Sequence, residues 1–402
     1  MSTPRRRADA LRIVPRAWMK QPATRAVMRA LGGQARFVGG CVRDTLLKRP
    51  IGDIDIATPL LPDAVMKSLA RARIKAVPTG LAHGTVTAVI GKRHFEITTL
   101  RRDVETDGRH AEVVFDGDYE ADSRRRDFTM NALSLTLDGA VFDYQNGLRD
   151  LKAGKVRFIG DAATRIAEDV LRLLRFYRFQ ARYGRGAADK DARAACRAST
   201  TLLPTLSGER VAAELLKLLG VPDPVPTLIL MEKDGVLAPI LAPRDPVVSR
   251  RLIRIEPQPD PLRRLGVLIA EDHDGVGRHL KLSNALRDRL VAMAAPIDLA
   301  ADARAQRALL YRLGRAAYED RVLVTAAVSG KTRNVKALLA SAARWRPVAF
   351  PLKGRDVTAL GVAPGPAVGQ ILAGVEAWWI DGDFKAARRA CLAEMKRRVA
   401  KI

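Results

Sequence analysis

Two aspartates separated by one residue, Asp53 and Asp55, have the type and spacing needed for metal-dependent chemistry. They lie in a short apolar run typical of a strand, where residues two apart point to the same face. Two carboxylates held side by side repel each other unless a cation neutralises them, and Mg²⁺ prefers oxygen ligands of this kind. The pair therefore predicts a magnesium site with Asp53 and Asp55 as its metal ligands.

A pair of glycines lies upstream of the aspartates. A short apolar run ends at Gly39 and Gly40, and an amphipathic segment carrying Arg43 follows. Glycines let backbone N–H groups approach a phosphate closely, and a helix N-terminus attracts anions. A phosphate cradle close to a carboxylate pair indicates nucleotidyl or phosphoryl transfer.

Residues 39–44 (Gly-Gly-Cys-Val-Arg-Asp) and 53–58 (Asp-Ile-Asp-Ile-Ala-Thr) resemble a known head-domain signature. It is that of class II tRNA nucleotidyltransferases and bacterial poly(A) polymerases, RNA-extending members of the DNA polymerase beta superfamily. The resemblance implies that Gly40 and Arg43 hold the triphosphate of an incoming nucleotide.

The superfamily also implies a third carboxylate near the metal pair, and Glu96 is the candidate. It lies in the apolar run 95–100, which predicts a strand, and shares a face of that strand with His94 and Thr98. A solvent-facing strand glutamate is an equally good interpretation, so both remain open.

A second motif begins with three consecutive arginines at 124–126, followed by Asp127 and Asn131. Guanidinium groups match phosphate oxygens and sugar hydroxyls in two-point fashion, and Asp127 can orient such an arginine. In the resembling families this segment binds the nucleotide and discriminates ribose, which implies this role for Arg126, Asp127 and Asn131. The alternative is an ordinary basic helix start.

A third motif, residues 165–182, is predicted to be one arginine-rich helix. Because three-residue steps rotate by about −60° each, Asp169 and Arg172 are neighbours while Arg178 lies on the far side. A carboxylate accepts from an exocyclic amine and a guanidinium donates to the ring acceptor beside it, an arrangement that suits cytosine and adenine. Uracil and guanine reverse this order and leave buried groups unpaired, at roughly 1–3 kcal/mol each.

Asp169 and Arg172 can thus replace a template strand, whereas Arg175 and Arg178 belong on phosphates or on the framework. Ordinary helical Asp–Arg pairs are the alternative. The Glu-Asp-x-x-Arg pattern of residues 168–172 resembles the nucleotide-selecting helix of class II tRNA nucleotidyltransferases. Residues 208–215 resemble the closing motif of the same region and are expected to brace that helix.

Composition limits the function classes. The 402 residues include 69 Lys and Arg against 44 Asp and Glu, a formal charge of +25 that favours a polyanionic partner. No apolar stretch approaches the roughly 20 residues of a membrane span, and the basic N-terminus lacks the apolar core of a secretory signal. The three cysteines make neither a disulfide framework nor a zinc site. We therefore expect a cytoplasmic protein.

The expected fold is α+β, with a polymerase-beta-like head of a small mixed sheet and helices, followed by all-α parts. Helices are predicted over 11–35 and 62–74, strands over 35–38, 75–77, 85–90 and 95–100, and a loop over 101–122. The predicted parts are a basic flexible N-terminus (1–20), a catalytic head (21–150), a nucleotide-selecting neck (151–220), a body (221–300) and a tRNA-binding tail (301–402).

The function expected from the resemblance is template-independent addition of C, C and A to the tRNA 3′ end. CTP and ATP are the substrates, pyrophosphate is released, Mg²⁺ is the cofactor and the tRNA acceptor arm is the partner. A bacterial poly(A) polymerase, a relative that adds only CC or only A, and a catalytically inactive RNA-binding module are the alternatives. The intact Asp53 and Asp55 pair argues against the last.

Overall fold

The computed structural model describes residues 11–81, 84–106, 111–115 and 117–401. The chain forms two compact units, Met1–Ile240 and Leu241–Ile402, which are described separately. Within the described residues, no helix is both long enough and apolar enough to cross a membrane.

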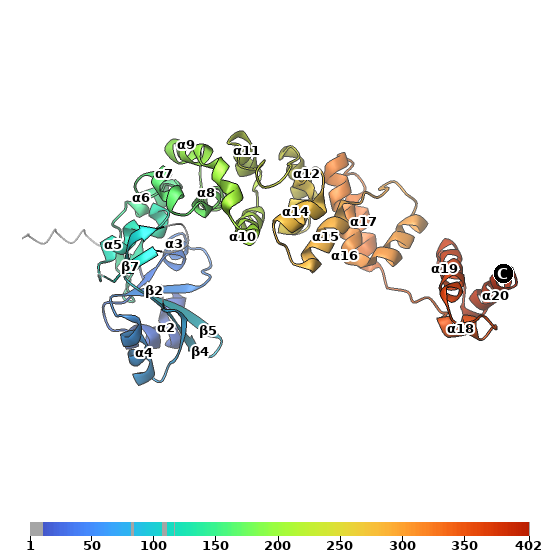
Figure 1. The fold of residues 1–402 in the computed structure, drawn as a ribbon, viewed down its shortest axis with the longest axis horizontal. Coiled ribbons are helices and arrows are strands. Elements are labelled where there is room, and N and C mark those ends of the chain that lie inside the picture. The colour runs from blue at the N-terminus through green and yellow to red at the C-terminus, as the bar shows by residue number, and fades with distance from the viewer. Residues whose placement is uncertain (1–10, 82–83, 107–110, 116, 402) are drawn as a thin grey trace, which may run out of the picture. The chain divides into compact units, whose positions relative to one another are not determined.

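The first unit contains a mixed seven-stranded sheet in the order β3-β4-β5-β2-β1-β8-β9 (Figure 1). Its β2 and β5 are parallel, and the other neighbours are antiparallel. The strands are β1 (Arg36–Val38), β2 (Ile54–Thr58), β3 (Lys75–Gly80), β4 (Thr85–Ile90), β5 (Arg93–Thr99), β8 (Ser134–Leu135) and β9 (Val141–Phe142). The sheet confirms the polymerase-like α+β head predicted from the sequence.

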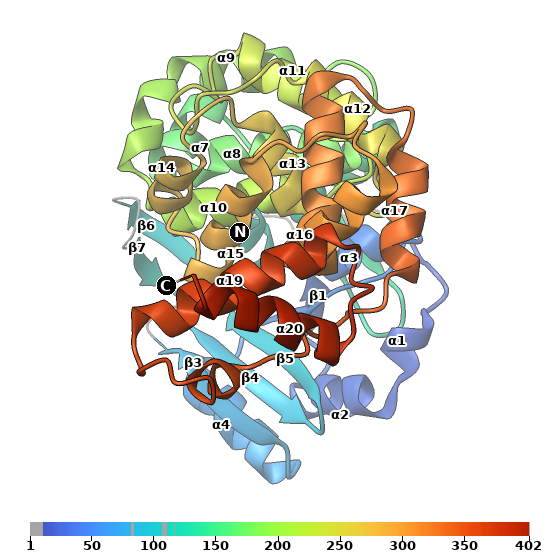
Figure 2. The same ribbon diagram turned by 90° about the vertical axis from the view of Figure 1, so that its right-hand side faces the viewer.

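Along the central strands, buried apolar residues alternate with acidic residues, so the two kinds of side chain lie on opposite faces of the sheet. In β2, Ile54 and Ile56 are buried, and Asp55 between them points to the other face. In β5, Phe95 and Ile97 are buried and Glu96 is exposed. Helix α3 (Gly40–Leu46) packs on β1 and β2, and α4 (Pro62–Arg71) packs beside β3 and β4 (Figure 2). The helices thus cover the apolar face, and the carboxylates lie on the opposite one.

The helix predicted over 11–35 is wrong for residues 11–16 and 31–35. The chain forms α1 (Ala17–Lys20) and α2 (Pro22–Ala30), and Gln21 between them is extended because it precedes a proline. Ahead of α1, Arg12 pairs with Ala140 beside strand β9. Of the predicted flexible N-terminus, residues 1–10 lie outside the described part of the chain.

The loop predicted over 101–122 is also wrong where the chain is described. Strands β6 (Arg102–Thr106) and β7 (Ala111–Val114) pair antiparallel in a separate two-stranded sheet, and α5 (Tyr119–Arg124) follows. The loop was predicted because the segment carries many charged residues. It also contains valine and threonine, which favour strands. Residues 107–110 and 116 of the predicted loop lie outside the described residues.

The remaining elements of the first unit are helical. The single helix predicted over 165–182 is wrong, because Asp169 is extended (φ −154°, ψ 105°) and separates two helices. Its carboxylate accepts a hydrogen bond from the Leu171 backbone N–H at 3.1 Å, a local bond that competes with the helical ladder. The helices are α6 (Gly147–Ala153), α7 (Ala162–Glu168), α8 (Leu171–Tyr183), α9 (Lys190–Ala198), α10 (Gly208–Leu219) and α11 (Val225–Lys233).

The second unit is all-α in its described residues, as predicted (Figure 1). Helix α16 is kinked at Gly314, whose φ of +74° is not helical. Trp379 and Met395 form part of one hydrophobic cluster, against which Tyr311 packs. The helices are α12 (Val247–Ile255), α13 (Pro261–Leu268), α14 (His273–His279), α15 (Asn284–Ala294), α16 (Ala303–Ser329), α17 (Val335–Arg344), α18 (Gly354–Thr358), α19 (Pro366–Asp381) and α20 (Arg388–Val399).

Candidate active site

One pocket of about 700 Å³ in the first unit brings together most of the residues singled out from the sequence. The predicted residues that line it are Gly40, Arg43, Asp53, Asp55, Arg126, Asp127, Asn131, Asp169, Arg172, Arg175 and Arg178. Gly39, the other glycine of the predicted pair, also lines the pocket, and the lining residues that were not predicted are Arg125, Leu171, Phe179 and Arg210. The three motifs, far apart in the chain, therefore meet at one place.

The carboxylates lie where β2 begins. Asp55 is half-buried within the strand, and Asp53 is exposed immediately before it. In the parallel ladder Asp55 is the register partner of Glu96 on β5. Burial, and next the negative charge of Glu96, raise the pKa of Asp55 to about 6. Asp55 therefore holds a proton more readily than an ordinary aspartate, and additional positive charge beside it would favour its ionised form.

Glu96 lies beside this pair but does not line the pocket. Its side chain is exposed on β5. In the described part of the chain, no group of three or more His, Cys, Asp or Glu side chains is arranged as a preformed metal site. Asp53 and Asp55 nevertheless provide two oxygen-donor side chains in one pocket, the donor chemistry that a hard divalent cation requires.

The paired glycines form the wall next to the carboxylates. Gly39 precedes α3 with φ +69°, a backbone conformation that favours glycine. A Cβ added at Gly39 would lie 3.5 Å from both Arg126 Nη1 and Asp55 Oδ2. The glycine backbone therefore lies directly between an arginine and a carboxylate of the pocket.

Arg43 is held in a buried network. Its Nε and Nη2 donate to the two carboxylate oxygens of Asp44 at 3.1 and 2.9 Å, and Nη1 donates to Asn131 Oδ1 at 2.6 Å. The guanidinium also lies 4.2 Å from the ring centroid of Tyr183 on α8. Helix α3 is thus linked to the second motif and to the first helix after the Asp169 break.

Asp127 orients Arg175 rather than one of the arginines at 124–126, among which its partner was expected. Its Oδ2 accepts from Arg175 Nε and Nη2 at 2.8 and 2.6 Å, and its Oδ1 accepts from Asn131 Nδ2 at 2.8 Å. Burial alone would raise the pKa of Asp127, but the charge of Arg175 and these hydrogen bonds outweigh it and lower the pKa. Arg126 instead pairs with Asp122 at 3.1 Å.

Asp169 and Arg172 both reach the pocket, although the helix expected to place them is interrupted. Both Asp169 carboxylate oxygens accept from Arg210 Nη2 at 2.9 Å. Arg172 pairs with Glu168 and donates from Nη1 to the Arg165 carbonyl at 3.1 Å. Each member of the predicted template pair therefore has its own partner in this structure.

Helix α10 holds Asp169 and Arg178 from consecutive turns. Arg210 reaches Asp169, and Glu214, four residues later, pairs with Arg178 on α8. Residues 208–215 therefore brace the segment that carries Asp169 and Arg178, as expected from the sequence. The sequence motif gave no sign that Arg210 also lines the pocket, because its contact with Asp169 joins residues 41 positions apart. Phe179 was missed because its apolar side chain indicates only helix packing.

Comparisons with known proteins agree with this geometry. Residues 35–157 match the poly A polymerase head domain, and residues 188–247 match the "probable RNA and SrmB- binding site of polymerase A". The mitochondrial CCA tRNA nucleotidyltransferase 1 of Mus musculus is 33% identical over 386 residues, which cover 90% of this chain and 87% of the relative.

Two bacterial proteins give the same result. The CCA-adding enzyme of Lactobacillus delbrueckii subsp. bulgaricus is 32% identical, covering 85% of this chain and 88% of the relative. The crystal structure of the Bacillus stearothermophilus CCA-adding enzyme in complex with CTP superposes with a TM-score of 0.78 at 28% identity, covering 95% of this chain and 98% of that chain. The chain therefore belongs to the CCA tRNA nucleotidyltransferase family.

Proposed function

We propose that this protein adds C, C and A to the 3′ end of tRNA from CTP and ATP, releasing pyrophosphate. The observation that carries the proposal is the shared pocket, in which Asp53 and Asp55 lie with Asp169 and Arg172. A reaction centre and a base-reading pair in one cavity are what a polymerase without a template requires. The names of the relatives in Mus musculus and Lactobacillus support the same activity.

We assign nucleotide addition and tRNA binding to the parts of the chain that were predicted from the sequence. The head (21–150) holds the reacting groups, and the neck (151–220) selects the base. The body (221–300) and tail (301–402) hold the tRNA acceptor arm, for which the formal charge of +25 is suited.

Asp53 and Asp55 would hold the divalent cation, which we assign as Mg²⁺. When bound, it would supply Lewis acidity and neutralise charge around the RNA 3′-hydroxyl, the α-phosphate and the leaving pyrophosphate. The half-buried Asp55 carboxylate fits this role because a cation bound beside it would offset the burial and the Glu96 charge that raise its pKa. Glu96 completes the catalytic set by holding negative charge beside Asp55, its partner in the strand register.

The incoming nucleotide is held by arginines and backbone. Gly40, Arg43 and Arg126 face its phosphates, since guanidinium forks bind phosphate oxygens in two-point fashion. Arg175, fixed by Asp127, and Arg178, fixed by Glu214, extend this positive wall. Asn131 bonds to Arg43 and Asp127 at once, which fixes its amide where it can meet a ribose hydroxyl.

Asp169 and Arg172 select the base by hydrogen bonding. The carboxylate accepts from the exocyclic amine of cytosine or adenine, and the guanidinium donates to the adjacent ring nitrogen. Because Arg210 already donates to Asp169, the carboxylate must share its oxygens between Arg210 and the base. Uracil and guanine would instead present an acceptor oxygen to Asp169. The base would then supply no donor to the carboxylate, and the two facing acceptors would cost roughly 1–3 kcal/mol.

The decisive assay supplies tRNA lacking its last three nucleotides, with Mg²⁺ and each nucleoside triphosphate separately or together. We expect CTP alone to extend the RNA by two residues, and CTP with ATP to extend it by three. Repeated addition from ATP alone would indicate a poly(A) polymerase instead. Arrest after CC in the presence of ATP, or addition of A only to tRNA ending in CC, would indicate a partial activity.

A further inference from the structure

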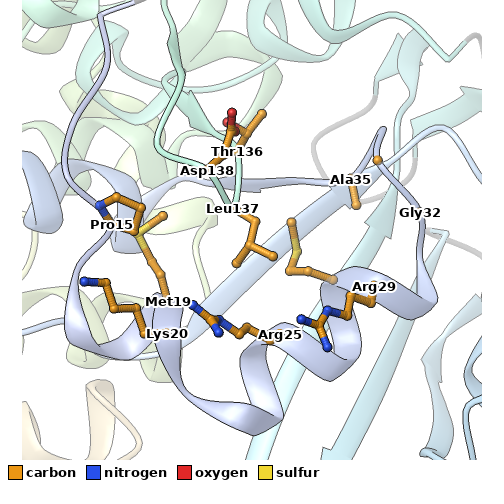
Figure 3. A pocket seen from close by; sticks show the side chains of 12 residues that line it. Pro15, Met19, Lys20, Arg25, Arg29, Gly32, Ala35, Thr136, Leu137 and Asp138 are labelled. Carbon is orange, nitrogen blue, oxygen red and sulfur yellow. The ribbon is translucent and has the colours of Figure 1, made fainter.

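A second cavity of about 850 Å³ lies in the first unit and shares no lining residue with the active-site pocket. Its walls are α2, the segment before it, and the turn between β8 and β9 (Figure 3). Ala35, next to the start of β1, borders this cavity, whereas Gly39, just beyond the end of β1, borders the active site. The two cavities therefore lie at opposite ends of the same strand.

Three cationic side chains line one side of this cavity: Lys20, Arg25 and Arg29 (Figure 3). Arg25 and Arg29 are four residues apart on α2 and so lie on one face of the helix. Within the described residues, none of the three has a hydrogen-bond or ion-pair acceptor for its side chain. Three unpaired cations around one cavity attract a ligand with several negative charges.

The single acidic residue of the cavity is already neutralised. Asp138 pairs with Arg12 at 3.0 Å and accepts a hydrogen bond from the Thr136 hydroxyl. The Thr136 hydrogen bond and then the Arg12 charge lower the pKa of Asp138. It therefore does not supply a counter-ion to Lys20, Arg25 and Arg29.

Apolar side chains complete the cavity. Met19 and Met28 are buried, and the half-buried Leu137 projects from the turn between β8 and β9 toward the arginine side (Figure 3). Methionine side chains are flexible and polarizable, and they pack well against aromatic rings. Cationic groups beside an apolar floor match a ligand that combines phosphate with a planar ring.

We propose that this cavity is a second nucleotide-binding site, in which Lys20, Arg25 and Arg29 bind phosphate and the base lies against Leu137 and the exposed edge of Met28. The ligand class is a phosphorylated nucleoside, either free or as part of a single-stranded RNA. The site does not rest on the proposed activity, because its ligand binds without turnover and away from Asp53 and Asp55.

The test compares the full-length Arg25→Gln/Arg29→Gln variant with a matched control, Lys67→Gln/Arg71→Gln. The control removes two exposed cations, also four residues apart, from the neighbouring helix α4 and outside the cavity. In one arm a short single-stranded RNA is titrated at several salt concentrations. In the other, equilibrium dialysis counts the ATP molecules bound per chain.

If RNA occupies the cavity, we expect the salt slope of RNA binding to fall by about 1.4 in the arginine variant, for two lost phosphate contacts, but not in the control. If a free nucleotide occupies it, the ATP count falls from two to one in the arginine variant alone. Leu137→Trp, which places a bulkier side chain in the proposed base position without changing charge, should reproduce either loss. Equal slopes and equal counts in the wild type and all variants would overturn the proposal.

Discussion

The guanidinium of Arg210 donates from one nitrogen, Nη2, to both carboxylate oxygens of Asp169, at 2.9 Å each. The two residues come from different elements, since Asp169 follows α7 and Arg210 lies on α10. The carboxylate that we assign to base reading is therefore positioned from outside its own segment. This contact gives Arg210 a measurable part in specificity.

Arg210→Ala should reduce base discrimination more than it reduces stability. Without Arg210, the Leu171 backbone N–H still holds one Asp169 oxygen, but the carboxylate loses the contact that Arg210 makes to both oxygens. A mispositioned acceptor loses about 1–1.5 kcal/mol, so the preference for CTP over UTP should fall roughly tenfold. The measurement is kcat/KM for each triphosphate on tRNA lacking its terminal nucleotides.

Arg197→Ala is the matched control for Arg210→Ala. It removes an Arg–Asp contact in the same unit while Arg193 still holds Asp234. Both variants should lower the melting temperature modestly, but only Arg210→Ala should change the CTP-to-UTP ratio. If the CTP-to-UTP ratio were the same in the two variants, Arg210 would have only a structural role.

Asp169→Asn and Asp169→Ala should differ in which wrong base they admit. An asparagine amide can donate as well as accept, so it can meet the O4 acceptor of uracil, whereas alanine offers no hydrogen bond. We expect UTP incorporation to rise relative to CTP in Asp169→Asn and to remain low in Asp169→Ala. The same nucleotide preference in both variants would contradict a reading role for this carboxylate.

Asp127→Asn should lower the free energy of unfolding by roughly 2–3 kcal/mol, because it leaves the Arg175 charge without its main partner. Because folding lowers the pKa of Asp127, its stabilising contribution is fully present above about pH 3.8, the ordinary pKa of aspartate, and is lost as the pH falls further. Chemical denaturation between pH 2 and 6 should therefore show that the free energy of unfolding falls less steeply with decreasing pH in the variant than in the wild type.

Asp138→Asn serves as the exposed comparison for Asp127→Asn. Its pair with Arg12 lies at the surface, and such pairs contribute little. The loss of stability should be much smaller than for Asp127→Asn. If the free energy of unfolding of Asp127→Asn fell with decreasing pH as steeply as that of the wild type, other carboxylates would account for the pH dependence.

Much of the site follows from local sequence rules. Asp53 and Asp55 were identifiable because a two-residue spacing places side chains on one face, and the glycines because a tight turn needs φ > 0. The break in the helix at Asp169 could not be predicted, because apolar residues recur at helical spacing both before and after it in residues 165–182. Its cause is a side-chain bond to the Leu171 backbone N–H, which competes with the helix only in this context.

Long-range pairing explains the other differences. Asp127 could have paired with any of the three preceding arginines, and only the approach of α8 decides in favour of Arg175. Likewise, the contact of Arg210 with Asp169 depends on how α10 packs on α8. Which residues form these pairs depends on tertiary packing, and the spacing of residues in the sequence does not predict it.

Mg²⁺ should stabilise the wild-type protein against heat. A cation that binds only the folded state adds about 2.7 kcal/mol at a concentration 100 times its Kd. Asp55→Asn should abolish this stabilisation, while Asp63→Asn, an exposed carboxylate on α4, should leave it unchanged. Thermal melting over a Mg²⁺ titration measures both. An equal Mg²⁺-dependent shift in the wild type and Asp55→Asn would place the cation elsewhere.

The most direct test of the central claim is nucleotide incorporation by Asp53→Ala on tRNA lacking its last three nucleotides, with CTP binding measured in parallel. If Asp53 and Asp55 carry the reaction and the neck selects the base, incorporation should fall by roughly 10³-fold, since several kcal/mol of transition-state stabilisation are lost, while the affinity for CTP changes only a few-fold. Incorporation at the wild-type rate would contradict the account.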